Sequence, residues 1–352
     1  MPDGPDISDV LARLRGSDRL TRPEADGVFE SLLAGKMNEA QICDLLTLLA
    51  ERGPSVAELA GAADAMRRHV TPVVAPTGSD VRVIDTCGTG GAPKTFNVST
   101  AAAIVAAACE PEAGSGIRRV VVAKHGNRSR TGRGSAEVLG ALGVNVDASP
   151  ETQSRCLDDA GVCFCFAIHH HPAMKHAAGP RKALGFPTIF NLLGPLTNPA
   201  GASRQLIGVY AEPFVDLVAA ALVELGAERA MVVHARDGLD ELTVTAPTLV
   251  AHVDRGSVRR EEIDPAALGL APAAIEDVRV ESVEGSAELI RRILDGAPGP
   301  ARDMVALTAA GALLVAEASA DWGRSLAIAN DAIDSGRARE KLERLAAVSH
   351  AP

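Results

Sequence analysis

The fold class is set by residues 81–108, which read VRVIDTCGTGGAPKTFNVSTAAAIVAAA. Residues 81–85 have the apolar alternation and β-branched side chains of a short strand, and a glycine-rich turn follows them. Ser99–Ala108 is rich in alanine, the residue with the highest helix propensity. A strand that leads through glycines into a helix is typical of parallel α/β sheets.

The same order of strand, polar loop and helix returns further along the chain. We expect strands over 119–123, 163–167 and 230–234, α/β character through 205–303, and helices over 136–142, 304–317, 322–335 and 337–348. Strands separated by helices predict a mainly parallel central sheet, whose ligands bind beyond the carboxyl ends of the strands. We therefore expect residues 76–352 to form one large α/β domain.

Residues 1–75 are predicted to form a small helical domain. Three pairs match capping boxes, in which two polar side chains three residues apart satisfy backbone N–H groups: Thr21 with Glu24, Asn38 with Gln41, and Ser55 with Glu58. The helices are expected to be followed by left-handed glycines, Gly16, Gly35 and Gly53. A further helical stretch over about 172–204, broken by Pro180, Pro187 and Pro195, is expected to complete this domain.

The composition of the 352 residues excludes several classes of protein. Hydrophobic residues make up 47% and charged residues 23%, which argues against a disordered chain. The net charge is −10 and only 3% of residues are aromatic, so a general nucleic-acid surface is not expected. No apolar run reaches the roughly 18 residues of a membrane span. Six cysteines without paired spacing predict reduced thiols in a cytoplasmic protein.

Two motifs predict binding of phosphate groups. The glycines of 88–91 let the backbone approach an anion, and Ser99 and Thr100 stand where the next helix offers free N–H groups. Lys124-His-Gly-Asn-Arg128, expected in the loop after the strand 119–123, gathers cations in a chain of negative charge. Taken alone, the glycine cluster could be only a tight turn and residues 124–128 only a solvated loop. The two motifs together favour an anion site.

Asp240 and Glu241 are adjacent carboxylates expected just after the strand 230–234. Such a pair is usually a solvated turn or the start of a helix. Opposite two anion-binding loops, it favours Mg²⁺, which keeps several waters and bridges carboxylates to phosphates.

Three consecutive histidines, His169–His171, suggest a transition-metal site. Consecutive side chains on an extended segment point in alternating directions, and no Cys or carboxylate lies at ligand spacing, so we favour pocket lining by His171 instead. Cys163 and Cys165 share one face of a predicted strand, where buried packing is expected.

Together these motifs resemble those of the anthranilate phosphoribosyltransferase family. The resemblance covers nearly the whole chain and rests on Cys-Gly-Thr-Gly-Gly (87–91), Phe-Asn-Val-Ser-Thr (96–100), Lys-His-Gly-Asn-Arg (124–128), His-Pro-Ala-Met-Lys (171–175), Thr-Ile-Phe-Asn-Leu-Leu-Gly-Pro-Leu-Thr-Asn-Pro (188–199) and Asp-Gly-Leu-Asp-Glu (237–241). It implies a small helical domain beside a large α/β domain, and a homodimer that forms through the helical part. The net charge and the lack of a long apolar run predict no nucleic-acid or membrane partner.

The resemblance also implies which residues bind which ligand. Anthranilate would contact Gly88, Asn127, His171 and Arg181, and Mg²⁺ would be held by Ser99, Asp240 and Glu241. The other substrate, 5-phosphoribosyl 1-pyrophosphate (PRPP), would contact Gly88, Gly91, Ala92, Thr95, Asn97, Val98, Ser99, Thr100, Lys124, His125, Gly126, Asn127, Arg128 and Thr131.

The implied reaction is displacement of pyrophosphate from the ribose C1 by the amine of anthranilate, in tryptophan biosynthesis. It needs no catalytic acid or base, because an aromatic amine is neutral near pH 7 and positioning supplies the rate. This chain departs from the family pattern at Ala92, where an acidic residue is usual, and at Ile168, Gly179 and Pro187. A same-fold phosphoribosyltransferase or nucleoside phosphorylase with another acceptor is the alternative.

Overall fold

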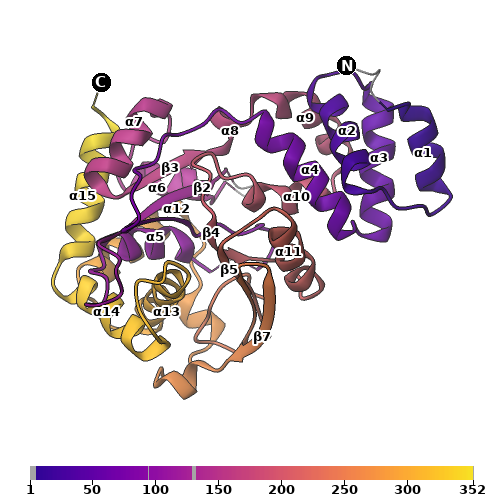
Figure 1. Cartoon of the computed structure of the whole chain (residues 1–352). Helices are drawn as coiled ribbons and strands as arrows, with labels where there is room; N and C mark the ends of the chain where they lie inside the picture. The colour runs from indigo at the N-terminus through magenta and orange to yellow at the C-terminus, as the bar shows by residue number, and fades with distance from the viewer. Residues whose placement is uncertain (1–4, 94, 129–131, 352) are drawn as a thin grey trace.

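The computed structural model describes residues 5–93, 95–128 and 132–351. Helices α1 to α4 stand together at one end of the molecule, and a larger α/β body holds the C-terminus (Figure 1). Within the described ranges, no helix has the length and hydropathy that crossing a membrane requires.

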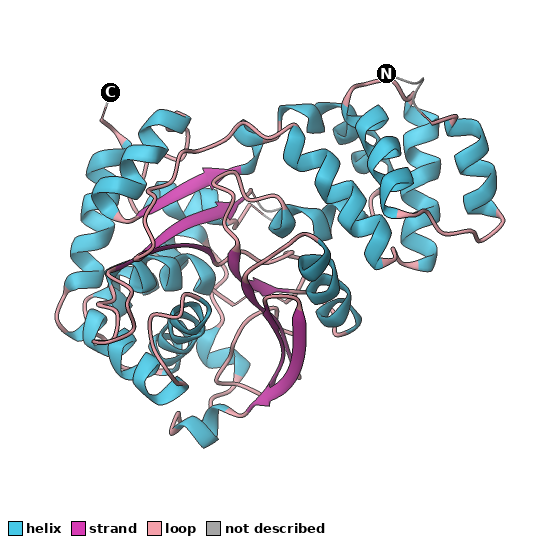
Figure 2. Ribbon diagram, in the orientation of Figure 1, coloured by secondary structure: helices cyan, strands magenta, loops and turns pink. Residues whose placement is uncertain are grey.

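In the described part of the chain, seven strands form a single sheet at the centre of the body (Figure 2). The order across the sheet is β3-β2-β1-β4-β5-β6-β7; the first five strands are mutually parallel, and β6 and β7 are antiparallel to their neighbours. The prediction of a mainly parallel sheet is therefore confirmed. The strands are β1 (Val81–Asp85), β2 (Arg119–Gly126), β3 (Val162–Phe166), β4 (Arg204–Gly208), β5 (Arg229–Ala235), β6 (Thr248–Asp254) and β7 (Ser257–Ile263).

Helices precede the sheet, connect its strands and follow it. The N-terminal helices are α1 (Ile7–Arg15), α2 (Arg22–Leu33), α3 (Glu39–Arg52) and α4 (Val56–Arg68). The helices between strands are α5 (Val98–Ala108), α6 (Ser135–Ala141), α7 (Pro150–Arg155), α8 (Ala167–His170), α9 (Lys175–Leu184), α10 (Ile189–Leu193) and α11 (Pro213–Glu224). After β7 come α12 (Val283–Leu294), α13 (Pro300–Val315), α14 (Trp322–Asp334) and α15 (Arg337–Ser349).

The three predicted capping boxes are all present. Gln41 N donates to Asn38 Oδ1 over 3.0 Å, and Asn38 N donates back to Gln41 Oε1 over 3.0 Å. The boxes at Thr21 and Ser55 have the same reciprocal pattern. Each box needs only residues three positions apart, so the local sequence is sufficient to form it.

Several local expectations are corrected by the structure, among them the extended segment expected at the histidine run, because His169 and His170 lie in helix α8. Gly16 has a φ of −76°, and the left-handed residue after α1 is Ser17, with a φ of 70°. Lys124 and His125 belong to β2 and not to a loop, because β2 pairs with β3 as far as Gly126. The helix expected to begin at 304 begins at Pro300, which suits a first helical position. Pro180 lies inside α9 and does not break it, because the proline is buried and α9 packs on α3.

Alternate residues of the central strands belong to two different hydrophobic cores. Leu206 of β4 and Val233 of β5 join a core made with α5 and α13. Their neighbours Ile207 and Val232 join a second core with α11, α10 and the N-terminal helices. Because side chains alternate across a strand, one sheet serves both layers.

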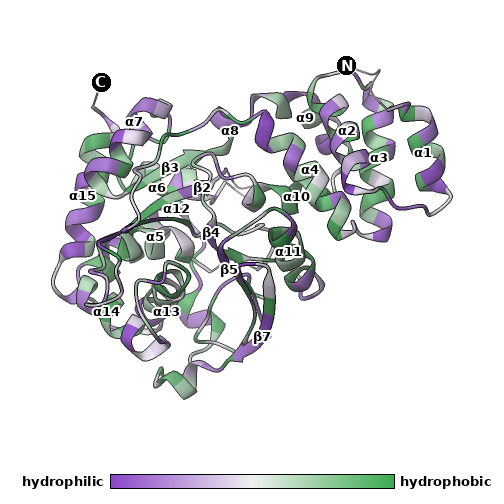
Figure 3. Ribbon diagram, viewed as in Figure 1, coloured by the Kyte–Doolittle hydropathy of each residue, from purple (hydrophilic) through white to green (hydrophobic). Residues whose placement is uncertain are grey.

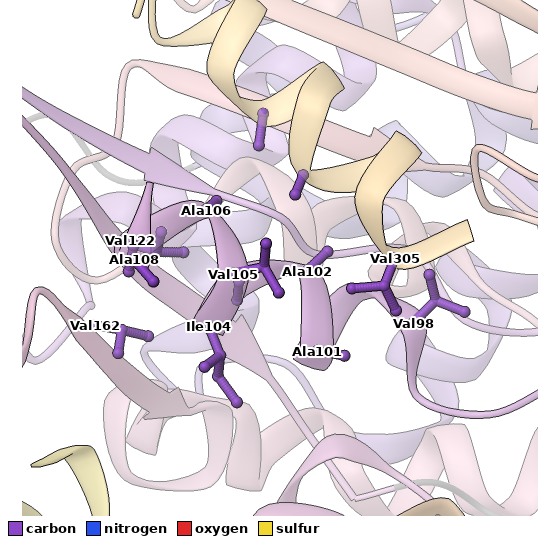
Figure 4. Packing of buried hydrophobic residues seen from close by; sticks show 14 of the residues in the cluster. Val98, Ala101, Ala102, Ile104, Val105, Ala106, Ala108, Val122, Val162 and Val305 are labelled. Atoms are coloured by element: carbon purple, nitrogen blue, oxygen red, sulfur yellow. The ribbon is translucent and has the colours of Figure 1, made fainter. Parts of the chain in front are cut away.

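Helix α5 is buried on nearly every side. Figure 4 shows its Val105 and Ala102 between strands β2 and β3 and helix α13, which contributes Val305. Alanine gives α5 a narrow cross-section, so it packs closely on both the sheet and α13. Strand β3 and much of α13 are hydrophobic in Figure 3, whereas the outer helix α15 carries both kinds of residue.

Helices α9 and α10, from the stretch expected to complete the helical domain, pack on the N-terminal helices. Helix α9 contacts α2 and α3, and α10 contacts α3 and α4. Phe29 of α2 and Phe190 of α10 meet edge to face, with ring centroids 5.8 Å apart. The N-terminal bundle is thus joined to a segment more than a hundred residues later in the chain.

Candidate active site

A cavity of about 1240 Å³ lies where the parallel strands end. Its walls come from the loop after β1, the end of β2, the end of β4 and the loop after β5. The start of α5 and residues of α9 and α10 complete it. This is the edge at which ligands of α/β sheets bind, as the sequence predicted.

The glycine loop is fastened to the end of β4. Thr89 N donates to Gly208 O over 2.8 Å, and Tyr210 N donates to Thr89 Oγ1 over 3.1 Å. A Cβ on Gly208 would overlap the carbonyl of Asp240, so the loop after β5 can cross here only over a glycine. A Cβ on Gly88 would lie 3.3 Å from Asp240 Oδ2. The glycine turn and the acidic pair therefore meet directly.

Lys124 brings a buried positive charge to the start of α5. Its side chain is 2% exposed, and Nζ donates to Ser99 Oγ over 3.1 Å and to Thr86 O over 3.3 Å. Burial lowers the pKa of Lys124, and the negative charge of Asp85 opposes that shift. Lys124 reaches this position because it lies in β2, one strand away from the glycine loop that follows β1.

Asp85 holds the ends of β1 and β2 together. Its Oδ1 accepts from His125 N over 3.0 Å, and its Oδ2 accepts from Asn198 Nδ2 over 2.8 Å. Asn198 belongs to the 188–199 motif, and its Nδ2 also donates to Ala123 O. The motif therefore fastens the floor of the cavity.

His125 and His171 form a hydrogen-bonded pair, with their Nε2 atoms 3.2 Å apart. His125 Nδ1 lies 3.0 Å from Gly194 O; a carbonyl only accepts, so Nδ1 carries the proton. In neutral His125, Nε2 is then the acceptor, and His171 Nε2–H donates to it. Burial lowers the pKa of His125 to about 3 and that of His171 to about 4, so both rings are neutral near pH 7.

The other two histidines of the run have protein partners. His169 Nε2 lies 2.8 Å from Asp147 Oδ1, and His170 bonds to Thr71 O and Gln153 Oε1. Across the described ranges, no group of three or more His, Cys, Asp or Glu residues is arranged to hold a metal ion. The run is thus structural apart from His171, which lines the cavity.

Asp240 and Glu241 add two carboxylates to the wall of the cavity. Loss of water around Glu241, together with the charge of Asp240, raises the pKa of Glu241 well above its usual range, while Lys124 opposes the shift. A pair of acids that repel one another favours a cation between them and a ligand phosphate. Two protein carboxylates suit Mg²⁺, whose other ligands are water and phosphate oxygens.

Arg181 lies on the opposite, helical side of the cavity. Its guanidinium carbon is 5.2 Å from the centre of the Phe190 ring. Burial lowers the pKa of Arg181, and no charged partner among the described residues offsets that shift. A half-buried cation beside an aromatic ring is suited to a planar ligand that carries a carboxylate.

Most of the predicted binding residues line this one cavity. They are Gly88, Gly91, Ala92, Thr95, Asn97, Ser99, Lys124, His125, Gly126, Asn127, Arg128, His171, Arg181, Asp240 and Glu241. Val98 and Thr100 are fully buried and do not line it, and Thr100 Oγ1 donates to Ser135 Oγ over 3.1 Å. Thr131 lies outside the described residues.

Among the lining residues that the sequence analysis missed are Ser135, Arg279, Ser282 and Ser286. Ser135 opens α6 after Gly134, a strand-to-helix pattern like that of Ser99, and this pattern could have indicated it. The three residues of 279–286 carry no local signal, since only the packing of α12 on α6 brings them to the cavity.

Known proteins are similar to this chain over nearly its whole length. Residues 80–339 match the model described as "Glycosyl transferase family, a/b domain", and residues 8–70 match "Glycosyl transferase family, helical bundle domain". The anthranilate phosphoribosyltransferase of Methylobacterium nodulans is 47% identical over 97% of this chain and 98% of its own length. That of Rubrobacter xylanophilus is 46% identical, with 97% of each chain covered.

Solved structures are similar over the same length. The crystal structure of anthranilate phosphoribosyltransferase from Thermus thermophilus has a TM-score of 0.88 and 38% identity, covering 97% of this chain and 100% of its own. The Saccharomyces cerevisiae enzyme in complex with PRPP and Mg has a TM-score of 0.85 and 25% identity, with 97% of each chain covered. The chain therefore belongs to the anthranilate phosphoribosyltransferase family, as its motifs predicted.

Proposed function

We propose that this chain transfers the phosphoribosyl group of PRPP to the amine of anthranilate, releasing pyrophosphate, in tryptophan biosynthesis. The observation that carries the proposal is the convergence of three motifs on one cavity. The glycine loop, the basic end of β2 and the acidic pair after β5 all line it, and Arg181 faces them from α9. A sugar diphosphate and a small aromatic acid together match this distribution of charge.

PRPP binds along the strand ends in this proposal. The loop residues Gly88, Gly91, Ala92 and Thr95 approach the diphosphate, and the start of α5 at 97–100 supplies N–H and hydroxyl donors. Lys124 adds a positive charge from β2. Residues 125–128 and the loop through Thr131 bind the 5-phosphate of PRPP in this proposal. Val98 and Thr100 act through the helix that they build, since their side chains are buried.

Mg²⁺ fits the acidic pair. Asp240, Glu241 and the Ser99 hydroxyl are the residues that would hold it, and all three line the cavity. When bound, the ion neutralises charge on the departing diphosphate. The contribution of the chain is to keep Asp240 fixed against Gly88 and Gly208, with Glu241 next to it in the sequence.

Anthranilate binds between Arg181 and the strand ends. Arg181 pairs with its carboxylate, Asn127 and Gly88 contact the ring and amine, and His171 lines the entrance. Asn127 Oδ1 accepts from Arg128 N over 2.8 Å, which leaves its amide N–H groups to face the ligand.

Catalysis in this proposal is a matter of position and charge. The aromatic amine is neutral near pH 7, and His125 and His171 are neutral too, so no strong base is needed at C1. The cavity aligns the amine with C1, and Lys124 with the α5 terminus stabilises charge on the leaving diphosphate.

The assembly and the compartment are proposals as well. The N-terminal helices project from the α/β body (Figure 1), which leaves their outer faces available to a second copy in a homodimer. All six cysteines are free thiols, which suits the cytoplasm. We place the domain boundary at 75/76, with 172–204 added to the helical part. Sedimentation equilibrium tests the dimer, because a monomer at micromolar concentration would contradict it.

A direct assay tests the activity. Anthranilate fluorescence should fall when the protein, PRPP and Mg²⁺ are combined, and should persist when any one is omitted. Turnover of a pyrimidine nucleoside with phosphate, without loss of anthranilate, would instead assign the chain to a same-fold enzyme with another acceptor.

A further inference from the structure

Asn97 stands at the start of α5 without capping it. Its side chain makes no hydrogen bond to the first turn, although Asn is among the best capping residues. Its φ of −85° and ψ of 68°, with Val98 N donating to Phe96 O over 3.0 Å, describe an inverse γ-turn. An ordinary cap has an extended backbone, so this turn directs the Asn97 side chain away from the helix end.

Ser286 of α12 holds that unusual conformation. Its hydroxyl accepts from Asn97 N over 3.2 Å and donates to Asn97 Oδ1 over 3.0 Å, so a single oxygen fixes both ends of the residue. Ser286 is 3% exposed, and the two residues are 189 positions apart in the chain. The acceptor atom that would otherwise cap α5 is therefore occupied from outside the helix.

The first turn of α5 is left open toward the cavity as a result. Thr100 N and Ala101 N both bond to Asn97 O, whereas Ser99 N has no hydrogen-bond partner among the described residues. The buried ammonium of Lys124 reaches the same point, on Ser99 Oγ. A free N–H and a buried cation thus share one small volume, which favours an anion there.

We propose that Ser286 is a positioning residue for the diphosphate site, because it holds Asn97 off the α5 terminus and keeps the Ser99 N–H open for phosphate. The inference rests on the proposed function, since PRPP is the ligand. Without the Ser286 hydroxyl, Asn97 relaxes to an extended backbone and caps α5. The cap then competes with phosphate for the same donor.

Ser286→Ala tests the proposal, with PRPP binding measured by calorimetry in the absence of anthranilate. We expect the Kd for PRPP to rise about fivefold, the loss expected from a competing capping bond. The KM for anthranilate and kcat at saturating PRPP should change less than twofold. Ser286→Thr, which keeps the hydroxyl, should restore the parent Kd. Ser31→Ala is the matched control, since Ser31 is a buried helical serine that is not among the residues lining the cavity.

A crystal structure of the ligand-free Ser286→Ala variant shows directly whether Asn97 changes conformation. Asn97 Oδ1 within hydrogen-bond distance of Ser99 N or Thr100 N supports the proposal. The proposal is overturned if the Asn97 side chain stays in place, or if the Kd for PRPP is within twofold of the parent value. A lower Tm with unchanged PRPP affinity would show that Ser286 contributes only to packing. If the unmodified protein fails to bind PRPP, the proposed function fails, and the crystal structure still decides the role of Ser286.

Discussion

At the scale of single residues, the cavity is organised by basic side chains that are partly or fully removed from water. Lys124 is buried beside Ser99, and Arg181 lies against an aromatic ring without a carboxylate partner in the described ranges. Buried cations are costly unless an anion compensates them. These two residues therefore favour a negatively charged ligand at each end of the cavity.

Arg181→Ala should weaken the binding of anthranilate far more than that of PRPP. Loss of a charge-assisted hydrogen bond in a partly buried site costs about 2 kcal/mol, or roughly thirtyfold in KM. Steady-state kinetics with each substrate varied in turn would measure the split. Equal KM values for anthranilate in both proteins would contradict the assignment of the acceptor site.

The variant Asp240→Asn with Glu241→Gln should lose Mg²⁺-dependent turnover while keeping its stability. The change removes two mutually repelling charges with little change in volume, so Tm should stay equal or rise. Magnesium titration of activity and thermal unfolding measure the two effects. Glu288→Gln, an exposed carboxylate on α12, is the control. Full activity in the double variant would refute the metal role of the acidic pair.

His125 and His171 should make the protein less stable in acid. Their folded pKa values, about 3 and about 4, lie below the unfolded value near 6.5, so between these limits the unfolded chain binds more protons. Stability is then complete above pH 6.5 and falls toward pH 4, by at most about 1.4 kcal/mol per pH unit for each histidine. Denaturant unfolding at pH 7 and pH 5 should show a smaller difference for His171→Gln. An unchanged difference would exclude His171 as a source.

At the scale of elements, the end of β4 controls the position of the loop after β5. The backbone passes so near Gly208 that no side chain fits there. The carbonyl of Asp240 packs against Gly208, and its side chain lies against Gly88. The end of β4, the glycine loop after β1 and the loop after β5 are therefore packed against one another. None of these contacts is visible in the local sequence around Gly208.

Gly208→Ala should therefore reduce activity by at least tenfold and stability by about 2 kcal/mol, since the Asp240 backbone must move. Gly140→Ala is the matched control. Gly140 lies in α6 with open space around it, so alanine there should leave activity unchanged and stabilise slightly. Kinetics and thermal unfolding of both variants measure the contrast. Parent-like activity in Gly208→Ala would show that the acidic loop tolerates displacement.

At the scale of the whole molecule, the N-terminal helices are not an independent attachment. Helix α4 packs on α10 and α11, and these two helices belong to the same buried core as Ile207 and Val232 of the sheet. Arg67 of α4 also donates to Leu196 O over 2.8 Å. The bundle thus completes a core of the α/β body.

Removal of residues 1–70 should leave residues 71–352 insoluble or partly unfolded. The apolar faces of α10 and α11 would become exposed, and exposed patches of that kind cause association. Soluble yield and circular dichroism compare the shortened chain with the full one. A soluble product with a cooperative thermal transition would show that the α/β body has a sufficient core of its own.

Features that depend on neighbouring residues could be predicted from the sequence, whereas features that depend on contacts between distant segments could not. The capping boxes, the order of strands and helices and the phosphate-binding motifs follow from neighbouring residues, because each depends on side chains a few positions apart. The mainly parallel sheet follows from that order. The boundaries of β2 and α13 and the left-handed Ser17 do not, since pairing and packing extend or shift the ends of elements.

The sequence by itself determined the fold class, the family and the motifs that meet at the cavity. Only the tertiary structure decided that Lys124 is buried against Ser99, that His125 pairs with His171, that Gly208 must lack a side chain and that Ser286 holds Asn97. The physical reason is that these contacts join different elements, up to 189 positions apart, and no local pattern of residues encodes their geometry.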